Sequence, residues 1–88
     1  MFKKMKGVNI PYVQQGLIYF CCRNYLNEPA EMQRKIVRLC MQTGGLNWAA
    51  LKEVVTTGKS LRLIAQEHSV SESCLYRLRK RFYEGWAG

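Results

Sequence analysis

A run of basic side chains near the carboxyl end is the part of this sequence best suited to binding anionic groups. Arg77, Arg79, Lys80 and Arg81 lie close together, and Tyr76 precedes them. The chain of 88 residues has 14 Lys and Arg against six acidic residues, which gives a formal net charge of +8. Because guanidinium and ammonium groups pair with anionic oxygens, this charge indicates a polyanionic partner, either nucleic acid or an acidic membrane face.

The sequence gives little support to catalysis or metal binding. All six acidic residues are Glu, so no site can be built on aspartates, as in a two-metal nuclease or recombinase. Cys21 and Cys22 are adjacent, Cys40 and Cys74 are isolated, and no C-x-x-C pair accompanies the single His68. No pairing of a nucleophile with a base is evident. We therefore expect no enzyme activity, no metal and no cofactor.

The amino-terminal segment bears on where the protein works. Lys3, Lys4 and Lys6 lead into a polar segment, whereas a signal peptide would continue into an apolar one. The longest apolar run, over residues 17–22, is far shorter than the roughly 18 residues that a membrane span needs. We expect a cytoplasmic protein with reduced cysteines and no membrane partner.

The elements that must position the basic side chains are helices, because no segment alternates with period two for long enough to need a strand. Residues 1–8 are expected to form a flexible basic tail. Asn9 can then cap, and Pro11 can open, a helix that extends to about Leu26. The apolar residues Val13, Leu17, Phe20, Cys21 and Tyr25 fall at helical spacings. The aromatic residues of this helix could form either part of the core or a dimer interface.

Two further amphipathic helices come next in the chain. Pro29 opens the second, over residues 29–43, and Gly44 and Gly45 end it because glycine accepts the left-handed conformation. Asn47 can cap a third helix, which runs to about residue 57 and ends at Gly58. The apolar positions of these two helices are Met32, Ile36, Leu39 and Cys40, then Trp48, Leu51, Val54 and Val55.

Residues 60–84 have the pattern of two short helices around a tight turn. Ser60 caps the first helix, residues 68–70 form the turn, and Ser71 caps the second. Two steeply crossed helices need a small residue where they touch, and Ala65 fills that position. The inward residues are Leu61, Ile64 and Ala65, then Leu75, Leu78 and Phe82. This helix-turn-helix pattern predicts an all-α, four- or five-helix domain over residues 9–88.

The segment I-A-Q-E-H-S-V-S-E-S-C-L-Y-R-L-R-K-R-F, over residues 64–82, resembles the helix-turn-helix of the homeodomain-like superfamily. It is similar to amino-terminal segments of insertion-sequence transposases, to resolvase-type DNA-binding domains and to small phage regulators that resemble sigma factor region four. The resemblance covers residues 47–84. It departs at Ser69, where glycine is usual, and at His68, where a hydrophobe is usual. It implies double-stranded DNA as partner and a small transcription regulator of a phage or mobile element as the role.

The expected DNA contacts divide into two sets. Residues at the start and middle of the second helix are expected to reach base edges in the major groove, where Arg77 can bind guanine through two hydrogen bonds. The others position the protein on phosphates without specifying sequence. The base-facing set is Ser71, Glu72, Ser73, Tyr76, Arg77 and Lys80. The phosphate set is Lys59, Ser60, Arg62, Arg79 and Arg81.

Three further possibilities stay open at this point. DNA binding could serve transposition or recombination, in an accessory protein without a catalytic domain. The helix pair could instead bind an acidic protein, such as an RNA polymerase subunit or another regulator. A homodimer is also left open, because many helix-turn-helix proteins bind paired half-sites.

Overall fold

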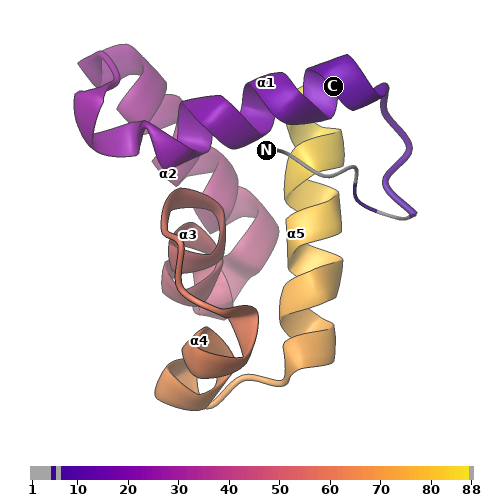
Figure 1. Cartoon of the computed structure of the whole chain (residues 1–88). Helices are drawn as coiled ribbons and strands as arrows, with labels where there is room; N and C mark the ends of the chain where they lie inside the picture. Colours follow the sequence, from indigo (N-terminus) through magenta and orange to yellow (C-terminus); the bar gives the residue numbers. More distant parts are fainter. Residues whose placement is uncertain (1–4, 6, 88) are drawn as a thin grey trace.

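The computed structural model describes residues 5 and 7–87, and this part of the chain is all-α, as the sequence predicts. The described residues form five α-helices and two short 3₁₀ turns (Figure 1). The helices are α1 (Tyr12–Arg23), α2 (Ala30–Gly44), α3 (Trp48–Thr56), α4 (Leu61–His68) and α5 (Glu72–Ala87). The turns are η1 (Tyr25–Asn27) and η2 (Gly45–Asn47).

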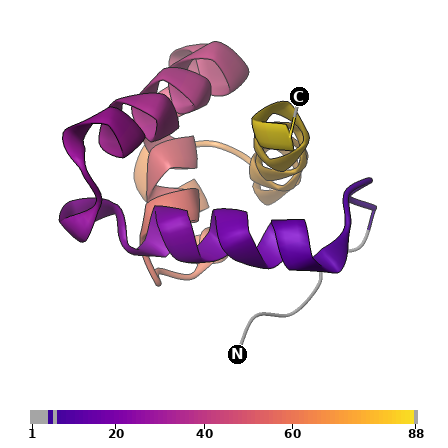
Figure 2. The same cartoon turned by 90° about the horizontal axis from the view of Figure 1, so that it is seen from above.

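The five helices are arranged so that α1 and α4 lie at opposite ends of the molecule. In Figure 1, α1 crosses the top, α5 runs down one side, and α4 lies at the bottom. Seen from above, α5 is viewed along its axis, with α1 and α2 on two sides of it (Figure 2). Helix α2 packs against both α3 and α5, while α1 packs across α3 and α5.

Buried side chains from all five helices form one hydrophobic cluster. The largest fully buried apolar side chains are Phe82, Ile18, Ile36, Leu51, Ile64 and Leu75. Cys22 and Cys40 are fully buried in the same cluster, where burial raises the pKa of both thiols, that of Cys40 to about 12. These two cysteines therefore pack as small hydrophobes.

The helix boundaries follow the predicted starts and stops closely after residue 28. Pro29 immediately precedes α2, and Gly45 follows it with a φ of 54°. Ser60 and Ser71 cap α4 and α5 as predicted, because their hydroxyl oxygens accept hydrogen bonds from the backbone N–H groups of Leu63 and Cys74, each at 3.1 Å. These hydroxyls satisfy N–H groups that a first helical turn leaves unpaired.

Two predicted caps are wrong in detail. Asn9 does not cap α1, because Pro11 itself precedes the helix, and the Asn9 backbone N–H instead bonds the Glu84 carboxylate at 3.3 Å. Asn47 does precede α3, yet its side chain makes no cap hydrogen bond, and its amide lies 3.9 Å from the Cys74 sulfur. In both cases the polar side chain or backbone group finds a tertiary partner that sequence spacing does not reveal.

The apolar residues that fall at helical spacings on α1 are largely exposed. Val13, Leu17 and Phe20 form an outer stripe on α1, with exposed fractions of 71%, 63% and 59%. The buried residues of this helix are Gln15, Ile18 and Cys22. Apolar residues occur on both sides of α1, so spacing alone did not identify the side that packs on the core.

Gln15 can be buried in α1 because its side-chain amide is fully engaged in hydrogen bonds to the preceding segment. Its side-chain amide donates to the backbone oxygens of Ile10, at 3.0 Å, and Val8, at 3.5 Å, and its oxygen accepts from the Met5 N–H at 2.9 Å. Val8 is buried in the core cluster. The flexible tail predicted over residues 1–8 therefore does not include Met5 or Val8, while residues 1–4 and 6 lie outside the described residues.

Candidate nucleic-acid interface

Helices α4 and α5 are joined by a tight turn of three residues. Backbone hydrogen bonds close it: the N–H of Val70 donates to the Ala65 oxygen at 3.0 Å, and that of Ser69 to the Gln66 oxygen at 3.4 Å. The backbone of Ser69 adopts the left-handed conformation, with a φ of 55°, which is common at the residue just after a helix. Ala65 is buried and Val70 is half-buried against the core, in the positions that the sequence pattern assigned to them.

A cluster of ionic side chains joins α4 to α3. Glu53 of α3 contacts His68 at the end of α4 and pairs with Lys59 at 2.9 Å, and Lys59 also pairs with Glu67 at 3.2 Å. Hydrogen bonds from His68 and Lys59 hold the pKa of the Glu53 carboxyl below its usual value. The bonds to Glu53 and Glu67 raise the pKa of Lys59. His68, unusual for the turn pattern, thus fastens α4 to α3.

The outer face of α5 carries every side chain that the sequence assigns to base contact within that helix. All six members of the base-facing set are exposed: Ser71, Glu72, Ser73, Tyr76, Arg77 and Lys80. On the opposite face Leu75, Leu78 and Phe82 are buried, as predicted. Glu72 lies in the first turn of α5, where its negative charge interacts favourably with the positive end of the helix dipole.

A shallow groove of about 440 Å³ lies where α4 meets the start of α5. Arg62 and Gln66 line it from α4, and residues 69–72 line it from the turn and α5. The groove therefore brings a member of the phosphate set, Arg62, beside two members of the base-facing set, Ser71 and Glu72. Gln66 was not among the predicted site residues, although its position four residues after Arg62 places it on the same exposed face.

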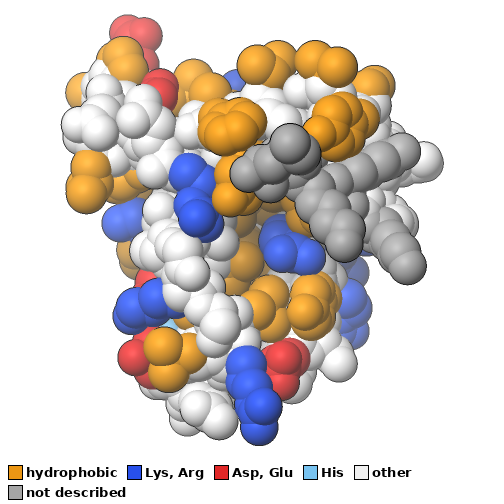
Figure 3. All heavy atoms as spheres, viewed as in Figure 1, with side chains coloured by type: hydrophobic (Ala, Val, Ile, Leu, Met, Phe, Trp, Pro, Cys, Tyr) orange, Lys and Arg blue, Asp and Glu red, His pale blue; other side chains and the backbone are white. Residues whose placement is uncertain are grey.

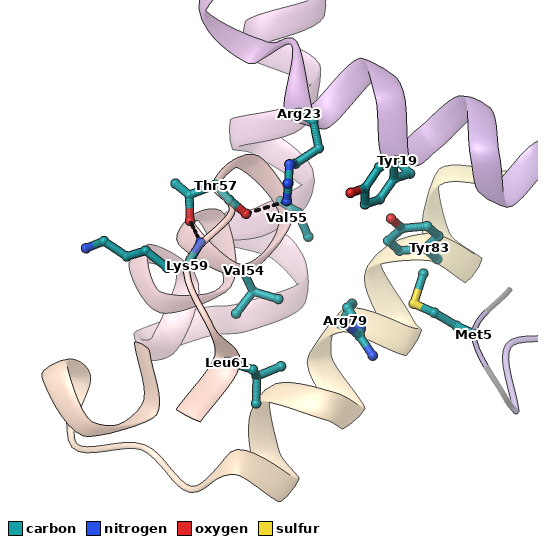
Figure 4. Close-up of a pocket in the computed structure, with 10 residues that line it drawn as sticks. All are labelled: Met5, Tyr19, Arg23, Val54, Val55, Thr57, Lys59, Leu61, Arg79 and Tyr83. Carbon is teal, nitrogen blue, oxygen red and sulfur yellow. Dashed lines mark hydrogen bonds between the residues drawn. The ribbon is translucent and has the colours of Figure 1, made fainter. Parts of the chain in front are cut away.

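The remaining phosphate-set residues have varied surroundings. Arg81 is exposed on α5. Lys59 is engaged with two carboxylates, and the hydroxyl of Ser60 caps α4. Arg79 is half-buried, lies 5.1 Å from the centre of the Tyr76 ring, and lines a cavity on another side of α5 (Figure 4). Arg62 and Arg81 are thus the phosphate-set residues best placed to contact an external partner.

The surface of the molecule is uneven in charge. In the space-filling view, Lys and Arg side chains are spread over the middle and lower parts, while hydrophobic side chains gather along the top, where Figure 1 places α1 (Figure 3). Residues 5 and 7–87 contain no group of three or more His, Cys or Glu side chains placed to hold a metal ion. None of the helices in that range is long and apolar enough to cross a membrane.

Comparisons of the chain with protein-family models, with curated proteins and with solved structures find no match. The function of this protein is therefore inferred from its residues and their geometry.

Proposed function

We propose that this protein binds double-stranded DNA sequence-specifically through α4 and α5, as a small transcription regulator of a phage or mobile element. The observation that carries the proposal is the exposed face of α5, where Tyr76, Arg77 and Lys80 lie opposite the buried Leu75 and Phe82. A face with this composition, on a chain of net charge +8, can bind DNA phosphates by charge and base edges by hydrogen bonds.

The dimensions of α5 fit this role. A helix of 16 residues is about 24 Å long and 10–12 Å wide, which matches the roughly 12 Å width of the major groove of B-DNA. Tyr76, Arg77 and Lys80 lie in the second and third turns of α5, in the half of the helix nearer to α4. With α5 in the groove, Arg62 at the start of α4 is the side chain that we assign to the flanking phosphates.

The test compares Arg77 with Arg62. A preferred duplex is first selected from a random pool, and the affinities of variants for preferred and scrambled duplexes are then measured at several salt concentrations. Arg77→Ala should weaken binding to the preferred duplex by about 1–3 kcal/mol and relax the preference at one base pair. Arg62→Ala should weaken both duplexes equally and reduce the salt slope by about one phosphate contact.

Arg34→Ala is the matched control. Arg34 is an exposed arginine of α2 that lines a groove with Tyr25 and Met41, so its loss removes the same charge away from α4 and α5. If Arg77→Ala leaves the ratio of preferred to scrambled affinity unchanged, its assigned base contact is wrong. If wild-type binding to duplex DNA does not weaken steeply with salt, the DNA-binding proposal fails, and binding of an acidic protein becomes the better explanation.

A further inference from the structure

A cavity of about 310 Å³ lies between α1, the connection from α3 to α4, and α5 (Figure 4). This volume is within the range of small-molecule sites in proteins. Val54 and Leu61 line one side of the cavity with apolar side chains, and Met5 lies on the other side, beyond Tyr83 and Arg79 (Figure 4). The polar lining of the cavity includes Arg23 of α1 and two members of the phosphate set, Lys59 and Arg79.

Two guanidinium groups stand at the polar side of the cavity. Arg23 of α1 donates to the Thr57 backbone oxygen at 2.8 Å and lies 5.1 Å from the centre of the Tyr19 ring. Arg79 of α5 lies 5.1 Å from the centre of the Tyr76 ring. These partners hold the guanidiniums in place without neutralising them. Within residues 5 and 7–87, no ion pair involves either arginine.

No carboxylate is among the described residues that line the cavity. Lys59 also borders it, but Figure 4 shows its ammonium group directed away from the other labelled side chains, toward its pairing with Glu53 and Glu67. Among the described lining residues, the positive charge directed into the cavity is therefore that of the two arginines. An anionic group that entered between them would meet opposite charge, and each guanidinium could donate two parallel hydrogen bonds to it.

A phenol adds a neutral donor beside these charges. Tyr83 of α5 is only 3% exposed, and its hydroxyl points into the space that it shares with Arg23 and the Tyr19 ring (Figure 4). Burial raises the pKa of this hydroxyl, so it keeps its proton and remains available to donate. An acceptor oxygen in this shared space can thus bind the phenol as well as the Arg23 guanidinium (Figure 4).

We propose that this cavity is a binding site for a small carboxylate with an apolar body, such as an arylalkanoate. The carboxylate would lie in the space that Arg23, Tyr83 and Arg79 line, and the apolar body would pack on Val54 and Leu61. Inorganic phosphate would use only the polar wall and leave the apolar wall in water. A neutral apolar molecule would bring no negative charge to the two guanidiniums.

The test uses three matched probes and the whole protein without DNA. Binding of 3-phenylpropionate, of the uncharged 3-phenylpropan-1-ol and of inorganic phosphate is followed by NMR shifts of the Val54 and Leu61 methyl groups and the Tyr83 ring. We expect saturable binding of 3-phenylpropionate, at least about tenfold tighter than that of the alcohol, because one charge-assisted hydrogen bond is worth about that factor. Phosphate should leave the methyl signals unmoved.

Three variants complete the experiment, each first checked for folding by circular dichroism. Arg79→Gln should weaken binding of 3-phenylpropionate about tenfold, and Tyr83→Phe, which removes a single oxygen, should weaken it severalfold. Arg77→Gln removes the same charge from the outer face of α5 and should leave the affinity unchanged. The proposal is overturned if 3-phenylpropionate fails to bind, if the alcohol or phosphate binds the same residues equally well, or if Arg77→Gln weakens binding as much as Tyr83→Phe does.

Discussion

Ser69 has a backbone conformation that a residue with a Cβ seldom adopts. Its φ of 55° and ψ of 43° place it in the left-handed region at the end of α4. Steric conflict between the Cβ and the backbone costs about 1–2 kcal/mol there, and glycine avoids it while losing more chain entropy on folding. Ser69→Gly should therefore raise the free energy of unfolding by about 0.5–1 kcal/mol, measured by urea denaturation.

Ser69→Ala separates the backbone effect from the loss of the hydroxyl. Alanine keeps the Cβ and therefore the strain, so this variant should gain nothing. An equal gain from alanine and glycine would show that the serine hydroxyl, and not the left-handed backbone, limits the stability of the turn.

Glu53 makes the contact between α3 and α4 sensitive to acid. Because hydrogen bonds from His68 and Lys59 lower its pKa in the folded state, the folded protein takes up this proton less readily than the unfolded chain. The resulting stabilisation is complete above the usual pKa of 4.5 and is lost as the pH falls through the lower folded value. The free energy of unfolding should thus decrease from about pH 5 to pH 3.

Glu53→Gln should flatten that decrease, measured as urea denaturation curves across the same pH range. Glu31→Gln is the matched control, because Glu31 is an exposed carboxylate in the first turn of α2 and its replacement changes the net charge equally. An acid dependence that is the same in both variants would assign the effect to overall charge, and the specific role of Glu53 would be wrong.

At the scale of elements, α1 gives the sharpest contrast between neighbouring residues. Ile18 is 1% exposed and lies in the core cluster, whereas Leu17 is 63% exposed on the outer stripe. Ile18→Ala should lower the free energy of unfolding by about 2–5 kcal/mol, through lost burial and a new cavity. Leu17→Ala should change it by no more than about 0.5 kcal/mol. A larger loss from Leu17→Ala than from Ile18→Ala would show instead that α1 packs its Leu17 side on the core.

The later helices could be predicted because several independent signals agree there. Pro29, the glycines at 44 and 45, Ser60 and Ser71 mark boundaries through local backbone chemistry, which acts wherever the helix packs. Helix α1 lacks such agreement. Its buried polar residue, Gln15, binds the backbone of the preceding segment, and its apolar residues lie on both sides, so only the tertiary structure identifies the inner face.

The exposed face of α5 could be predicted from local spacing, whereas the surroundings of individual basic side chains could not. The spacing of Leu75, Leu78 and Phe82 determined which face of α5 is buried and therefore which side chains are exposed. The surroundings of Lys59 and Arg79 depend instead on neighbours that are distant in sequence. Lys59 meets Glu53 of α3, and Arg79 lines a cavity whose opposite wall is α1, neither of which periodicity within one helix can indicate.

At the scale of the whole molecule, α2 connects the amino-terminal half to the α4–α5 pair. The backbone of α5 passes close to α2 at Gly85, where an added Cβ would lie 3.4 Å from the Leu39 side chain. The Lys35 ammonium lies 4.2 Å from the centre of a Trp86 ring. Ile36 is fully buried in the same cluster as Phe82, so removing α2 would expose the inner face of α5 to water.

We therefore expect the chain to unfold in one cooperative transition. In differential scanning calorimetry, the calorimetric enthalpy should equal the van't Hoff enthalpy, because no subset of helices keeps a closed core after the others unfold. A fragment of residues 47–88, which contains α3, α4 and α5, should remain largely unfolded by circular dichroism, since it leaves the α2-facing sides of Leu51 and Phe82 uncovered. Two resolved transitions, or a fragment 47–88 that melts cooperatively by itself, would show instead that the α4–α5 pair is an independent unit to which the amino-terminal helices are only attached.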